Sequence, residues 1–155
     1  VLHQQFQAKE HLKLMPMDDK SLLTVNVVTP DGVVYDNTTD LAVCKTTLGE
    51  VGIMPNRVPL LASLAIDEVR VKTGEDSFDE IAVSGGFIEF SNNVLSVVAS
   101  AAERKENIDA SRAERARARA EKRIATAKET HNIDDLRRAE VSLRRAMNRL
   151  NVSKH

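Results

Sequence analysis

The chain has 155 residues, a formal net charge of −1 and few aromatic residues, four Phe and one Tyr. That length allows one ordinary domain, or one small domain with an appendage, whose core must be built from Val, Ile, Leu and Ala. The single Cys excludes an internal disulfide. The sequence has no run of about 18 apolar residues typical of a transmembrane helix and no apolar signal-peptide core.

The first segment, residues 1–20, does not share the alternating pattern of the strands predicted after it. We interpret it as a natural extension or a remnant of an expression vector and leave it out of the fold prediction.

Residues 21–104 predict a β-sandwich domain. Apolar and β-branched residues alternate in short segments, which are separated by turn signals such as Thr29-Pro30-Asp31-Gly32 and Asn92-Asn93. The expected strands are residues 22–28, 33–35, 40–47, 64–73, 80–84, 87–90 and 94–99. Residues 49–59 hold two Gly and two Pro and are expected to form a loop. Cys44 lies in an alternating apolar stretch and is expected to be a buried thiol. The pattern is typical of an all-β sandwich or barrel.

Residues 105–155 predict a two-helix antiparallel hairpin, which we call the arm. From Asp109 onward there is no Gly or Pro, and Ala, Arg, Glu and Lys dominate. Asp109 is a candidate cap for a first helix that ends near Lys128, and a second helix is expected over residues 134–150. The second helix carries an apolar stripe, but the first offers mostly Ala. Such a hairpin buries little area, so its position should depend on what it packs against.

The two parts differ in charge. Residues 1–102 hold 7 Lys and Arg against 14 Asp and Glu, whereas residues 103–155 hold 15 against 9. Many of the arm's arginines recur at helical spacing: Arg112, Arg115, Arg119 and Arg123 on the first helix, and Arg138, Arg145 and Arg149 on the second. If the helices fold together, these rows could converge into a site for phosphate oxygens. The alternatives are a solvated face with local salt links, or nonspecific nucleic-acid binding, which the lack of stacking aromatics disfavours.

The sequence carries no motif of a catalytic or metal site. The phosphate-loop pattern GxxxxGK[ST] is absent, and the acidic pairs Asp67-Glu68 and Asp79-Glu80 are placed on solvent faces or turns. None of the four His has a Cys or carboxylate at zinc-ligand spacing; they are His3, His11, His131 and His155. We therefore predict no catalytic residue and no required metal or cofactor.

Several ordered motifs resemble those of the epsilon subunit of bacterial F-type rotary ATP synthases. They are Thr29-Pro30-Asp31-Gly32 with Tyr35-Asp36, Gly49-Glu50-Val51-Gly52-Ile53-Met54-Pro55, Val83-Ser84-Gly85-Gly86-Phe87-Ile88-Glu89, Ala101-Ala102-Glu103-Arg104, Ile108-Asp109-Ala110-Ser111-Arg112-Ala113, and Arg144-Arg145-Ala146-Met147-Asn148-Arg149-Leu150. The resemblance covers about residues 22–152. One departure is Asn56-Arg57, where the family usually has Gly-His.

The resemblance implies a fold of about ten strands followed by a helical hairpin, and a non-catalytic subunit. Its implied partners are the gamma subunit and the c-ring, and also the alpha/beta catalytic head when the arm extends and blocks ATP hydrolysis. The implied location is the cytoplasmic face of the bacterial membrane, peripheral and without membrane insertion. Neither nucleic acid nor a required cofactor is implied.

The resemblance also implies ATP as a regulatory ligand, because in several bacterial relatives the folded-down arm binds one ATP. The positions of this chain that match the family's motif are Glu103, Ile108, Asp109, Arg112, Ala113, Arg119, Arg145 and Arg149. The arginines are expected to hold the phosphates, and Glu103 and Asp109 the adenine or ribose donors. A stand-alone nucleotide sensor and a nucleic-acid adaptor remain the competing hypotheses.

Overall fold

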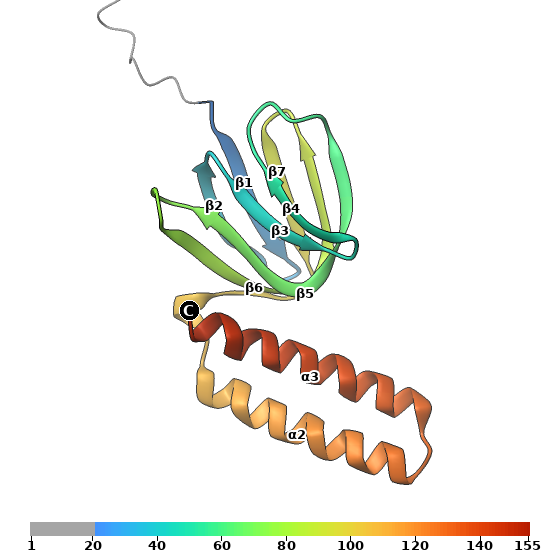
Figure 1. Ribbon diagram of the computed structural model, residues 1–155. Coiled ribbons are helices and arrows are strands. Elements are labelled where there is room, and N and C mark those ends of the chain that lie inside the picture. The colour runs from blue at the N-terminus through green and yellow to red at the C-terminus, as the bar shows by residue number, and fades with distance from the viewer. Residues whose placement is uncertain (1–20) are drawn as a thin grey trace, which may run out of the picture.

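A computed structural model describes residues 21–155 and shows a β-sandwich followed by two long helices (Figure 1). The predicted extension, residues 1–20, lies outside the described residues. The strands are β1 (Leu23–Thr29), β2 (Gly32–Thr39), β3 (Ala42–Thr46), β4 (Gly49–Ile53), β5 (Leu60–Lys72), β6 (Phe78–Ser91), β7 (Val94–Ala99) and β8 (Ala102–Arg104). A short 3-10 turn, η1 (Lys105–Asn107), leads into the helices α2 (Ala110–Glu129) and α3 (Ile133–Ser153).

The strands form one continuous hydrogen-bonded sheet in the order β2-β1-β7-β6-β5-β3-β4, with β8 paired to β6. Every pair is antiparallel except β1 with β7. The predicted β-sandwich with a helical hairpin is confirmed. The described residues form eight strands rather than about ten, because β5 and β6 are 13 and 14 residues long. Each of them runs through both layers of the sandwich.

The sequence predicted two strands on either side of Gly85-Gly86, but β6 passes through both glycines without ending. Gly85 and Gly86 have φ angles of +80° and +119°, which side chains disfavour. A Cβ on Gly86 would lie 2.0 Å from the backbone oxygen of Val98. The glycines therefore let β6 bend from one layer into the other, in close contact with β7.

The prediction of a loop over residues 49–59 is wrong for its first half. Residues 49–53 form β4, which pairs with β3 at the edge of the sheet. The turn that follows β4 explains why Asn56 can stand where the family usually has Gly. Asn56 has a φ of 64°, a conformation that Gly or Asn adopts more readily than other residues. Its amide N–H donates to Asn93 Oδ1 at 2.6 Å, which ties this turn to the β6–β7 turn.

The core lies between the two layers and consists of aliphatic side chains with few aromatics. Phe90, Leu23 and Ile81 are fully buried. Cys44 is also fully buried, as predicted, and burial raises its thiol pKa to about 12. Tyr35 lies at the edge of the core. Burial and its 2.7 Å hydrogen bond to Asp79 raise its pKa to about 12.

The two helices of the arm pack through alanine. The side chains of Asp109 and Asn132 cap α2 and α3, and accept hydrogen bonds from the amides of Arg112 and Asp135, each at 3.1 Å. The contact is lined by buried alanines that recur every seven residues: Ala113, Ala120 and Ala127 on α2, and Ala139 and Ala146 on α3. Small side chains let the helices approach closely but bury little apolar area. No helix among residues 21–155 is long and apolar enough to cross a membrane.

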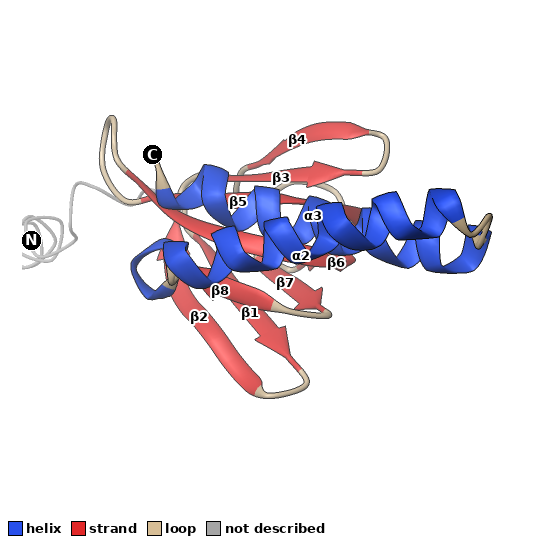
Figure 2. Ribbon diagram, turned by 90° about the horizontal axis from the view of Figure 1, so that it is seen from below, coloured by secondary structure: helices blue, strands red, loops and turns tan. Residues whose placement is uncertain are grey.

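The arm lies folded along the underside of the sandwich, with α3 between α2 and strands β5 and β6 (Figures 1 and 2). The buried side-chain amide of Asn148 donates to the backbone oxygens of Asp67 and Val83 at 3.0 and 3.3 Å. The expectation that the acidic pairs face solvent is wrong for Glu68 and Glu80. Their side chains are only 11% and 16% exposed, and they lie beside the end of the arm.

Candidate functional site

A cavity of about 480 Å³ lies between the two helices of the arm, and arginines dominate its lining. The lining residues are Ala116, Arg119, Ala120 and Arg123 from α2, and Ser142, Arg145 and Arg149 from α3. The alanines place no bulk between the helices, so the longer guanidinium side chains border an open space. Its volume lies within the range of about 300–1,000 Å³ that small-molecule sites occupy.

Two of the four arginines are held by carboxylates outside the cavity lining. The Nε atom of Arg149 lies 3.3 Å from Glu103 on β8, and an Nη atom of Arg123 lies 2.7 Å from Asp135 on α3. Arg119 and Arg145 take part in none of the salt bridges of the described chain. The cavity therefore has an excess of positive charge, and its lining contains no carboxylate. Guanidinium groups bind phosphate oxygens through paired hydrogen bonds.

The predicted site residues fall into two groups. Arg119, Arg145 and Arg149 come together at the cavity, and Glu103 contacts one of them. The remaining four lie around the start of α2 and do not line the cavity: Ile108, Asp109, Arg112 and Ala113. Among these, Asp109 caps the helix, Arg112 is exposed and Ala113 is buried against α3.

The site residues predicted from the sequence do not include Arg123 and Ser142, which also line the cavity. Helical spacing places Arg123 in the α2 row, but no signal singles it out from Arg115, which is exposed and does not line the cavity. Only the rotation of one helix against the other decides which arginines face inward. The lining offers phosphate-binding groups and a hydroxyl, but no group suited to act as a general base.

Comparison with known proteins places the chain in a family. Two family models match the chain. The model of the ATP synthase delta/epsilon chain β-sandwich domain matches residues 22–105, and that of the delta/epsilon chain long α-helix domain matches residues 106–154. The chain therefore belongs to the family of ATP synthase delta/epsilon chains.

Curated relatives narrow this assignment to the epsilon type. The ATP synthase epsilon chain of Ligilactobacillus salivarius is 77% identical over 139 residues, covering 90% of this chain and all of the relative. The epsilon chain of Levilactobacillus brevis is 56% identical over 138 residues, covering 89% and 99%. The resemblance to bacterial epsilon subunits is confirmed, and these relatives are non-catalytic subunits of a larger enzyme.

A solved structure with the same fold comes from the mitochondrial ATP synthase of Euglena gracilis, an assembly of OSCP, F1 and the c-ring. One of its chains matches with a TM-score of 0.71 over 90% of this chain and 88% of that one. The sequence identity is 17%, so this likeness describes the fold.

Proposed function

We propose that this chain is the epsilon subunit of a proton-translocating ATP synthase, and that its arm brakes ATP hydrolysis and binds ATP when folded down. The observation that carries the ATP proposal is the arginine-lined cavity between α2 and α3. The membership of the chain in the epsilon family supports its place in the central stalk.

In this proposal the phosphates of ATP lie among Arg119, Arg145 and Arg149. Arg119 and Arg145, which have no carboxylate partner in the described chain, supply the uncompensated charge. Arg112 and Asp109 lie at the start of α2, where they would meet the other end of the ligand, and Glu103 would accept from its base or ribose. No group in the cavity lining is suited to activate a water, so the bound ATP is not hydrolysed.

ATP would act by holding the two helices together. The alanine contact between them is weak, so a ligand that bonds to both adds a large share of the stability of the folded arm. At a hundredfold excess over its Kd, the ligand contributes about 2.7 kcal/mol. ATP would thus favour the folded arm. When ATP falls, the arm would extend toward the alpha/beta head and block hydrolysis.

The sandwich would supply the permanent contacts with the gamma subunit and the c-ring. Several large apolar side chains are exposed along residues 48–61, including Leu48, Val58 and Leu61 at 98%, 73% and 72%. Large exposed apolar patches are typical of protein contacts, and we propose that these side chains contribute to one. We place the subunit at the cytoplasmic face of the bacterial membrane, as a peripheral part of the complex.

Calorimetric titration of the isolated chain with ATP tests the binding step. The wild type should bind one ATP, and Arg119→Ala or Arg145→Ala should weaken binding about tenfold or more, since hydrogen bonds to charged groups contribute roughly 1.5–3 kcal/mol. Arg137→Ala is the matched control, because Arg137 is an exposed arginine of α3 that does not line the cavity. No ATP-dependent heat at millimolar ATP, or equal losses in all three variants, would contradict ATP binding in this cavity.

A further inference from the structure

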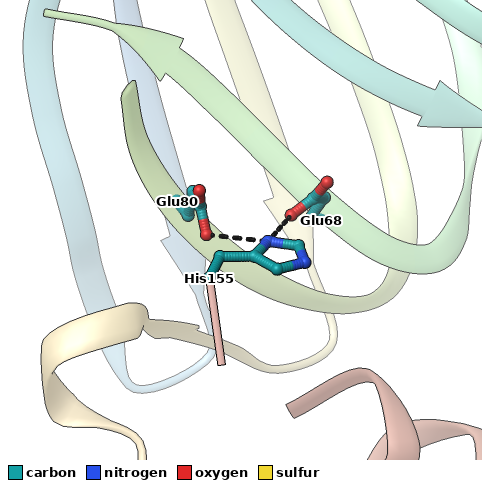
Figure 3. Close-up of side chains that lie close together, drawn as sticks. All are labelled: Glu68, Glu80 and His155. Carbon is teal, nitrogen blue, oxygen red and sulfur yellow. Dashed lines mark hydrogen bonds and ion pairs between the residues drawn. The ribbon is translucent and has the colours of Figure 1, made fainter. Parts of the chain in front are cut away.

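A second cluster of polar side chains lies where the end of the arm meets the sandwich. Glu68 on β5, Glu80 on β6 and His155, just beyond the end of α3, point toward one another (Figure 3). The Nδ1 atom of His155 lies 3.1 Å from Glu80 Oε2 and 3.3 Å from Glu68 Oε2. Lys105 donates to the backbone oxygen of His155 and so helps to hold that residue in place.

One imidazole nitrogen does not satisfy both carboxylates. Nδ1 of His155 forms its hydrogen bond with Glu80. Glu68 Oε2 is buried and has no hydrogen-bond partner among the described residues. The neighbouring cations face the other oxygen of Glu68: Arg70 Nε and Lys45 Nζ lie 3.7 and 3.9 Å from Oε1. A buried carboxylate oxygen without a partner is costly, and a cation bonded to all three side chains would remove that cost.

The spacing of the three possible ligand atoms, one from each side chain, fits a metal ion. Zinc bonds to His nitrogen and Glu oxygen at about 2.0–2.2 Å, so neighbouring ligands of a tetrahedral ion lie roughly 3.3–3.5 Å apart. The distances from His155 Nδ1 to the two carboxylate oxygens are close to that value. All three ligand atoms lie within 4.8 Å of one another. The side chain of His155 is 47% exposed, which leaves a path for the ion and a position for a water as fourth ligand.

We propose that Glu68, Glu80 and His155 form a zinc site that fastens the end of the arm to the sandwich. Two ligands belong to the sandwich and one to the arm, so the complete set exists only while the arm is folded down. A ligand that binds one arm position more tightly shifts the population toward it. Zinc would therefore favour the folded arm independently of ATP, because this cluster shares no residue with the cavity between the helices.

Titration of the full chain with zinc chloride tests this proposal. His3 and His11 are replaced by Asn in every protein used, which leaves His131 and His155 as the only imidazoles. The reference protein should bind one zinc ion, and His155→Asn or Glu68→Gln should weaken binding at least tenfold, since even groups that only orient metal ligands change affinity by 10–100-fold. His131→Asn is the matched control. His131 has a φ of 53°, which Asn tolerates, and it lies at the far end of the arm.

Protease cleavage of the arm gives a second readout. Zinc should slow cleavage severalfold in the reference protein and in His131→Asn, but leave His155→Asn unchanged. Magnesium should have no such effect at the same concentration, because it prefers oxygen ligands in an octahedral site. Zinc affinity that survives both His155→Asn and Glu68→Gln, cleavage that does not respond to zinc, or equal protection by magnesium would overturn the proposal.

Discussion

Asn148, on helix α3, donates a hydrogen bond from its side-chain amide to the backbone oxygen of Asp67 on β5, 3.0 Å away. A second bond from the same nitrogen reaches Val83 on β6. The side chain is buried, so it anchors the arm at one position across two neighbouring strands. It acts together with the buried Leu150 and Val152 of the same helix and with the ion pair between Arg149 and Glu103.

Replacing Asn148 with Ala should release the arm more often without unfolding the sandwich. The change leaves two strand oxygens without their partner and should weaken docking by about 1–3 kcal/mol. Trypsin cleavage within the arm should become faster, while the melting of the sandwich stays cooperative. Asn151→Ala is the control, because Asn151 is an exposed residue of the same helix. Equal cleavage rates for both variants would show that Asn148 does not anchor the arm.

Gly86→Ala should destabilise the sandwich far more than Gly52→Ala. At Gly86 the added Cβ would overlap the backbone oxygen of Val98 at 2.0 Å, in a φ region that Ala rarely adopts. At Gly52 the nearest atom is a flexible Leu41 side-chain carbon at 3.6 Å. We expect the first variant to lose several kcal/mol or to be insoluble, and the second about 1 kcal/mol or less. Thermal or urea unfolding of the two variants measures this difference. Similar unfolding midpoints would be inconsistent with close packing of Gly86 at the bend in β6.

A fragment of residues 21–104 should fold without the arm. The large buried aliphatic side chains lie in the strands, and the arm contributes mainly alanine together with Leu150 and Val152. Its unfolding should remain a single cooperative transition, measured by circular dichroism at increasing temperature. A molten or insoluble fragment would show instead that the arm is part of the folding unit, and that the proposed boundary near residue 105 is wrong.

Cys44 should resist thiol reagents in the native protein. Its side chain has no exposed surface, and burial raises its pKa to about 12, so at pH 8 the thiolate is scarce and inaccessible. Burial also determines how Cys44 makes the stability of the protein depend on pH. The unfolded thiol ionises near its ordinary pKa, so this group's contribution to stability is complete below that value and is lost as the pH rises toward about 12. An aromatic disulfide reagent should label Cys44 only after denaturant is added; prompt labelling of the folded chain would contradict this burial.

Local patterns predicted most of the elements but not their continuity. The alternation of residues 22–28 and the alanine-rich run after Asp109 each specify one element, and the structure has both. The strand at residues 49–53 was missed because its two glycines indicate a turn, and only pairing with β3 makes it a strand. The passage of β6 through Gly85-Gly86 depends likewise on its pairing with β7, and no local pattern describes that pairing.

The residues of the two candidate sites could likewise be predicted only where a local pattern joins them. Helical spacing grouped Arg119 with Arg112 and Arg115, but the inward-facing set depends on how α2 is rotated against α3. His155 and Glu80 are 75 positions apart, so no spacing rule for metal ligands could have joined them. Their proximity follows from the docking of the arm, which is a property of the whole fold.

The most direct test of the proposed function is the rate of ATP hydrolysis by the purified complex, assembled with either the full chain or a chain ending at residue 105. If the arm is the brake, both complexes should assemble, and the complex with the shortened chain should hydrolyse ATP severalfold faster at low ATP. The difference should shrink as ATP rises and favours the folded arm. Equal rates at low ATP in two fully assembled complexes would contradict the proposal that this arm restrains hydrolysis.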